Sequence, residues 1–126
     1  MATQRKSILV IHPLAKDPAG LRRLLADMGH TAVTVSQEKA ALRLLGTVRF
    51  DVIFTGLSGR EEGAARQFIG ALRSAAPGSA LVGINAGGVG AANEAWHAEC
   101  DALIAEPLSP RRVQWVLDFE LRYFGG

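Results

Sequence analysis

The chain has 126 residues, 48% of them apolar and 21% charged, which is typical of one globular domain. Its single cysteine, Cys100, excludes an internal disulfide and a cysteine-ligated metal cluster, as in proteins of a reducing compartment. No apolar run approaches the roughly 20 residues of a membrane span, and the polar residues before Ser7 do not resemble a secretory signal. A net charge of +2 with scattered Lys and Arg does not indicate a nucleic-acid surface.

Five short β-rich runs alternate with helical segments along the chain. The predicted strands cover 7–11, 31–35, 51–55, 80–84 and 102–105. The predicted helices run from Asp17-Pro18 to Gly29, from a Ser36 cap to Gly46, over 64–75, over 91–99, and from Ser109-Pro110 to about Phe124. This alternation predicts a doubly wound α/β fold, with helices on both faces of a five-stranded parallel sheet.

Three segments resemble the receiver domains of response regulators, the CheY-like family, over about residues 7–124. The first strand is one of them, and the second is 50–57, where Asp51 precedes the strand as an aspartate often does in the family. The third is 96–110, with Asp101, Pro107 and Pro110 at the places that the family pattern expects. The resemblance implies one receiver-like domain over 1–126, the flavodoxin-like strand order 2-1-3-4-5, a cytoplasmic location and a role in bacterial two-component-type signalling or transcription control.

The positions of the family's phosphorylation chemistry carry other residues in this chain. The two acidic Mg²⁺ positions fall on His12 and Pro13, the phosphoacceptor on Gly56 (Thr55 or Leu57 after a one-residue slip), the switch hydroxyl on Asn85 and the lysine on Glu106. Proline offers no ligand to a hard cation, and glycine offers no carboxylate nucleophile. We therefore expect a non-enzymatic pseudo-receiver that needs no cofactor, binds no metal and acts independently of phosphorylation.

A second function stays open for the same edge of the sheet. His12, Gly56, Asn85 and Glu106 could form a pocket that senses a small ligand or a metal, instead of a hydrogen-bonded relic of the acidic site. The glycine-rich stretch after Asn85 matches no phosphate-binding fingerprint, so it is interpreted as a loop. His30 and His97 are expected at the surface, and Cys100 is expected to be a structural thiol.

The last predicted helix carries two apolar stripes. The inward stripe comprises Val113, Val116, Leu117, Leu121 and Phe124. The second stripe comprises Trp115, Phe119 and Tyr123, flanked by Arg111, Arg112 and Arg122. One helix face cannot bury both stripes, so the second predicts an interface with a protein partner or a second copy, with no direct contact to nucleic acid or membrane. The alternative is that the preceding helix, through Trp96, covers part of this stripe.

Overall fold

The computed structural model describes residues 5–11, 18–56, 62–85, 99–105 and 109–120, without the side chains at 18, 19, 62, 85, 105, 119 and 120. The elements in chain order are β1 Ser7–Ile11, α1 Pro18–Asp27, β2 Thr31–Val35, α2 Glu38–Leu45, β3 Val52–Gly56, α3 Glu62–Ala75, β4 Ala80–Asn85, β5 Ala102–Ala105, α4 Pro110–Trp115 and the π-helical turn η3 Val116–Glu120. The helix predicted over 91–99 lies almost entirely outside the described residues.

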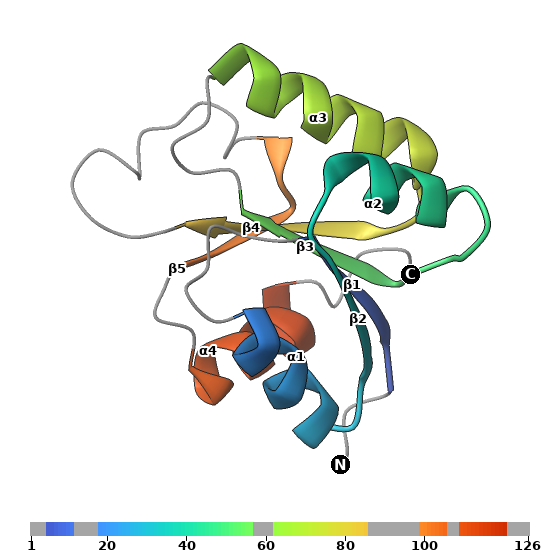
Figure 1. The fold of residues 1–126 in the computed structure, drawn as a ribbon. Coiled ribbons are helices and arrows are strands. Elements are labelled where there is room, and N and C mark those ends of the chain that lie inside the picture. The colour runs from blue at the N-terminus through green and yellow to red at the C-terminus, as the bar shows by residue number, and fades with distance from the viewer. Residues whose placement is uncertain (1–4, 12–17, 57–61, 86–98, 106–108, 121–126) are drawn as a thin grey trace.

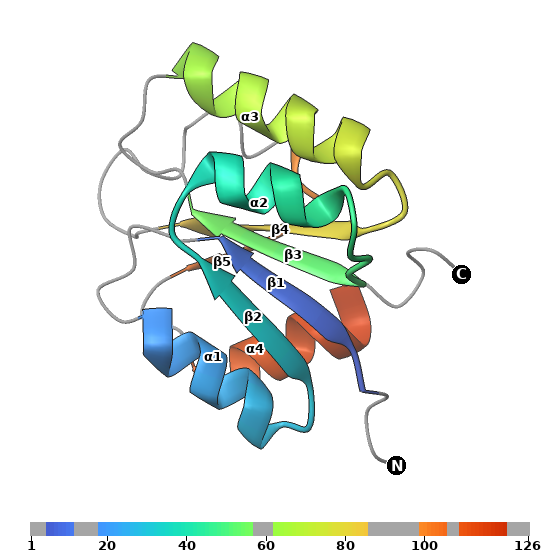
Figure 2. The same cartoon turned by 45° about the vertical axis from the view of Figure 1, so that its right-hand side comes forward.

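All five strands form one parallel sheet in the order β2-β1-β3-β4-β5. Helices α2 and α3 cover one face, and α1 and α4 cover the other (Figures 1 and 2). The predicted fold class and strand order are therefore confirmed. No helix in the described ranges is long and apolar enough to cross a membrane.

Successive side chains of the central strands enter two separate cores, because neighbouring residues of a strand point to opposite faces. Leu9 and Ile53 pack under α2 and α3 with Phe68, Ile69 and Leu72. Their strand neighbours Ile8, Val10, Val52 and Phe54 pack under α1 and the last helix with Leu25, Val113, Val116 and Leu117. Burial on both faces explains why these strands are continuous apolar runs.

Several predicted boundaries were wrong by one or two residues. Strand β3 begins at Val52 rather than at Asp51 and continues to Gly56, which pairs with Ile84 of β4. The segment 56–63, which lies between the predicted strand 51–55 and the predicted helix 64–75, thus includes the end of β3 and the start of α3. Helix α2 has Gln37 rather than Ser36 at its N-cap, and no side chain caps it.

The start of the last helix agrees with its sequence signature. The Ser109 hydroxyl accepts a hydrogen bond from the backbone N–H of Arg112 at 3.1 Å, and Pro110 occupies the first turn, where a missing N–H costs nothing. The α-helical geometry ends at Trp115 and a π-helical turn follows, which the sequence pattern did not predict. Residues from 121 onward lie outside the described part.

Candidate functional site

The carboxyl edge of the sheet brings the ends of four strands together. Ile11 pairs with Thr55, Gly56 with Ile84, and Asn85 with Ala105, so the segments that follow β1, β3, β4 and β5 start at one edge. Doubly wound sheets bind ligands at this edge. Among the predicted pocket positions, the structure places Gly56 and the backbone of Asn85 there, whereas His12, Pro13 and Glu106 lie outside the described residues.

Gly56 is the last residue of β3 and is buried. The residue before it, Thr55, has 0% exposure, and its hydroxyl has no hydrogen-bond partner among the described residues. A buried hydroxyl without a partner is costly, so it is a place where a bound molecule could contribute a hydrogen bond. The described residues contain no group of three or more His, Cys, Asp or Glu side chains that could hold a metal ion.

The described part of the last helix exposes one large aromatic side chain. Trp115 is 49% exposed, while Val113, Val116 and Leu117 are buried against the sheet. Arg111 is exposed beside it, and Arg112 donates through Nη2 to the carbonyl of Leu103 in β5 at 3.1 Å. Three residues of the predicted inward stripe are thus buried, and Trp115 of the second stripe is exposed. The Phe119 side chain, Tyr123 and Arg122 lie outside the described part.

His30 was expected at the surface, and that expectation is wrong. It is 5% exposed, and its Nδ1 accepts a hydrogen bond from the backbone N–H of Lys6 at 3.0 Å. The placement follows from the end of α1, where Gly29 has a φ of +92° and His30 donates its backbone N–H to Leu25. In this type of helix ending, the residue after the glycine packs back on the helix, so Gly29 was the available signal.

Cys100 is a half-buried thiol beside the apolar cluster under α2 and α3. Burial raises the pKa of the Cys100 thiol to about 12, with nearby Asp101 and Glu99 acting in the same direction and Arg73 opposing them. A thiol that stays protonated is a poor nucleophile, which supports the structural role assigned from sequence.

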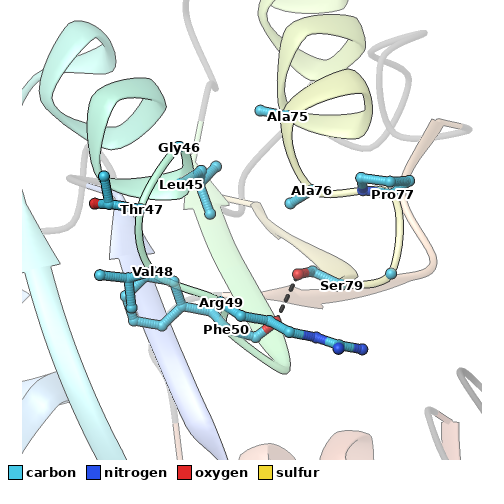
Figure 3. Close-up of a pocket in the computed structure, with 11 residues that line it drawn as sticks. Leu45, Gly46, Thr47, Val48, Arg49, Phe50, Ala75, Ala76, Pro77 and Ser79 are labelled. Atoms are coloured by element: carbon cyan, nitrogen blue, oxygen red, sulfur yellow. Dashed lines mark hydrogen bonds between the residues drawn. The ribbon is translucent and has the colours of Figure 1, made fainter.

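A groove at the opposite, amino edge of the sheet was not foreseen. It has a volume of about 490 Å³ and lies between the α2–β3 and α3–β4 connections (Figure 3). Leu45, Val48 and Phe50 contribute to one side, and Ala76 and Pro77 contribute to the other. The Ser79 hydroxyl donates to the Phe50 carbonyl at 2.6 Å and ties the two connections together (Figure 3). These segments are about 30 residues apart, so no local pattern could predict the groove.

No protein-family model matches the chain, and no curated protein matches it. Solved structures do match. The receiver domain of a sensor histidine kinase from Pseudomonas aeruginosa, with magnesium in its active-site cleft, is 18% identical over 98% of this chain and 100% of that chain, with a TM-score of 0.72.

Two further matches are response regulators. The chemotaxis response regulator CheY4 of Vibrio cholerae is 18% identical over 94% of this chain and 100% of its own, with a TM-score of 0.70. A two-component response regulator from Clostridium difficile is 17% identical over 98% and 100%, also with a TM-score of 0.70. At these identities the similarity establishes the fold: the chain has the receiver, CheY-like fold.

Proposed function

We propose that this chain is a pseudo-receiver: a phosphorylation-independent protein-interaction module of bacterial two-component-type signalling or transcription control, with no enzymatic activity. Its fold is that of receiver domains and response regulators, which supports a role in signalling. The proposal that the chain is not phosphorylated rests on the residues at the carboxyl ends of the strands. The proposed interaction role rests on the last helix. We further propose that the partner at this helix is a second copy of the chain.

The observation that carries the interaction role is the exposure of Trp115. Its neighbours Val113 and Val116 anchor the helix in the core, so the indole is presented on a rigid support. Arg111 is exposed beside it, and Arg112 links the helix to β5. Tryptophan and arginine are the residue types most enriched among those that dominate binding energy at interfaces.

Sedimentation velocity over a range of concentrations tests the interaction role. Trp115→Ala should shift the monomer–dimer equilibrium toward the monomer by at least about tenfold, because central interface tryptophans contribute about 2 kcal/mol or more. Val48→Ala is the matched control, since Val48 is 40% exposed and lies on the groove at the amino edge, away from the last helix. Equal distributions for wild type and Trp115→Ala would contradict self-association through this helix.

Phosphorylation independence is supported by the end of β3. Gly56 has no side chain, and the Thr55 hydroxyl is fully buried. Neither offers a carboxylate that could accept a phosphoryl group from a small donor. Incubation with acetyl phosphate and Mg²⁺ should therefore leave the intact mass unchanged, while CheY4 of Vibrio cholerae under the same conditions serves as the comparison. An added phosphoryl group on any carboxylate or on Thr55 would refute this part of the proposal.

The Thr55 hydroxyl, which has no hydrogen-bond partner among the described residues, favours a second candidate function, a module that senses a small ligand at the carboxyl edge. A ligand that binds only the folded state should stabilise it by about 2.7 kcal/mol at a hundredfold excess over its dissociation constant. Thermal unfolding with a panel of small polar metabolites measures this gain. Thr55→Val keeps the shape and removes the hydroxyl, so it should weaken the stabilisation if the pocket is used. A panel without any stabilising compound would count against this candidate.

A further inference from the structure

The proposed function makes no use of one polar side chain in the core, the buried His30. Helix α1 ends at a left-handed Gly29, whose N–H donates to Ala26, while the N–H of His30 donates to Leu25. These two hydrogen bonds are the Schellman pattern, which fixes the backbone of His30 against the end of the helix. The imidazole is thereby held at 5% exposure on a backbone that has little freedom to move it.

The hydrogen bonding of the ring defines its protonation state. Because Nδ1 accepts from the backbone N–H of Lys6 at 3.0 Å, the ring is neutral and its proton is on Nε2. That Nε2 is buried and has no hydrogen-bond partner among the described residues. The neutral ring thus accepts a hydrogen bond from the residue before β1, while its buried Nε2–H has no acceptor in the part of the chain that the structure describes.

Two charged groups act on the ring electrostatically, Lys6 from the segment before β1 and Asp118 from η3. Lys6 and Arg5 precede β1, and the Arg5 side chain donates to the Gly29 carbonyl. Asp118 belongs to η3, where its carboxylate accepts a hydrogen bond from the Gln114 side chain. Helix α1 and η3 share one core, in which Leu25 and Leu117 both take part. Burial and then Lys6 lower the pKa of His30, whereas Asp118 acts to raise it.

We propose that His30 is a proton-operated latch between the segment before β1 and the π-helical turn η3. In the neutral state, Nδ1 holds the Lys6 N–H and Asp118 is bound to Gln114. When the ring takes a second proton from solvent, Nδ1 becomes a donor and the Lys6 bond breaks. The resulting cation is repelled by Lys6 and attracted to Asp118, so its Nε2–H competes with Gln114 for the carboxylate.

The π-helical turn η3 is the element that responds to protonation of His30. Such turns are rare, occur as single-turn irregularities in helices, and are concentrated at functional sites. Asp118 lies inside this turn, and Trp115 directly precedes it. A change in the partner of Asp118 therefore acts on the helix segment next to Trp115. The latch requires only these contacts and does not depend on self-association of the chain.

NMR titration of the full chain between about pH 8 and pH 5 tests the latch. At the upper limit, long-range ¹H–¹⁵N spectra should assign the ring proton of His30 to Nε2. On acidification, the His30 ring, the Lys6 backbone amide and the Gln114 side-chain amide should titrate with one common midpoint below the ordinary histidine value of about 6.5. A Lys6 or Gln114 resonance that does not follow His30 would overturn the proposal.

Two variants separate the latch from a purely structural histidine. His30→Asn retains an acceptor near Nδ1 but does not titrate, so the pH response of Lys6 and Gln114 should disappear. Asp118→Asn removes the negative charge, so the His30 midpoint should move to lower pH and the Gln114 response should be lost. An unchanged midpoint in Asp118→Asn, or loss of native resonances over the whole domain at the His30 midpoint, would overturn the latch even if His30→Asn did not fold.

Discussion

The carboxylate of Asp101 binds both terminal nitrogens of Arg73, at 3.0 and 3.1 Å. The same carboxylate accepts the backbone N–H of Leu81 at 2.7 Å, so it joins α3 to β4 at the residue that precedes β5. Asp51 directly precedes β3, and its carboxylate likewise accepts a backbone N–H of a neighbouring strand, that of Ser7 in β1, at 2.8 Å. Each aspartate thus stands directly before its own strand, and its carboxylate accepts a backbone N–H of the adjacent strand.

Loss of the Asp101 carboxylate should destabilise the fold measurably. Asp101→Ala leaves the part-buried Leu81 N–H and the Arg73 guanidinium without this acceptor, at a cost of about 1–3 kcal/mol. Urea unfolding followed by circular dichroism measures the change. Arg66→Ala is the control, because the Arg66–Glu99 pair is exposed and should contribute less than about 1 kcal/mol. Equal effects for both substitutions would contradict a special role of Asp101.

Two Gly→Ala substitutions should change stability in opposite directions. Gly29 has a φ of +92°, which an L side chain adopts at a cost of about 1–2 kcal/mol, so Gly29→Ala should lower the free energy of unfolding. Gly70 lies on the exposed side of α3, with open space where a Cβ would be added, so Gly70→Ala should raise it by about 0.5–1 kcal/mol. Thermal and urea unfolding of the two variants provide the comparison, and a stabilising Gly29→Ala would contradict the assigned conformation.

The thiol of Cys100 should react slowly in the folded protein. With its pKa raised to about 12, it is almost entirely protonated at pH 8, and alkylation by iodoacetamide should be much slower than in urea-unfolded chain. The unfolded thiol ionises at lower pH than the folded one. Protonation of Cys100 therefore favours the folded state. Its contribution to the free energy of unfolding is complete below the ordinary thiol pKa and is lost as pH rises toward 12. Equal alkylation rates in both states would show that the thiol is not protected.

Acid should destabilise the domain through His30. Because the pKa of His30 is lowered in the folded state, the unfolded chain binds a proton there first as pH falls. The free energy of unfolding should be insensitive to this group above about pH 6.5 and decrease below that value, until the folded ring also protonates. Urea unfolding between pH 5 and pH 8 should give a flatter profile for His30→Asn. Parallel profiles would indicate that another group causes the acid sensitivity.

The predictions from sequence were most accurate where the controlling residues are close together in the chain. The strands 7–11, 31–35 and 102–105, the stop at Gly29 and the Ser109 cap all agree with the structure. The prediction that Ser36 caps α2 was wrong, because the N-cap residue with the extended backbone is its neighbour Gln37. The limits of β3 failed because they depend on which residues find a partner in β1 and β4.

The sequence alone determined the alternation of elements, and thereby the fold class, since apolar periodicity and turn residues act locally. The resemblance placed the phosphoacceptor position on Gly56, with Thr55 and Leu57 as alternatives, whereas the pairing of Gly56 with Ile84 shows that β3 extends to Gly56. The tertiary structure decided which polar side chains become buried or paired. It buries His30 against Lys6, sets Asp101 between Arg73 and Leu81, and buries the Thr55 hydroxyl where no other described residue bonds to it. Such outcomes depend on segments 20 or more residues apart, whose contacts exist only after the sheet and its helices have packed together.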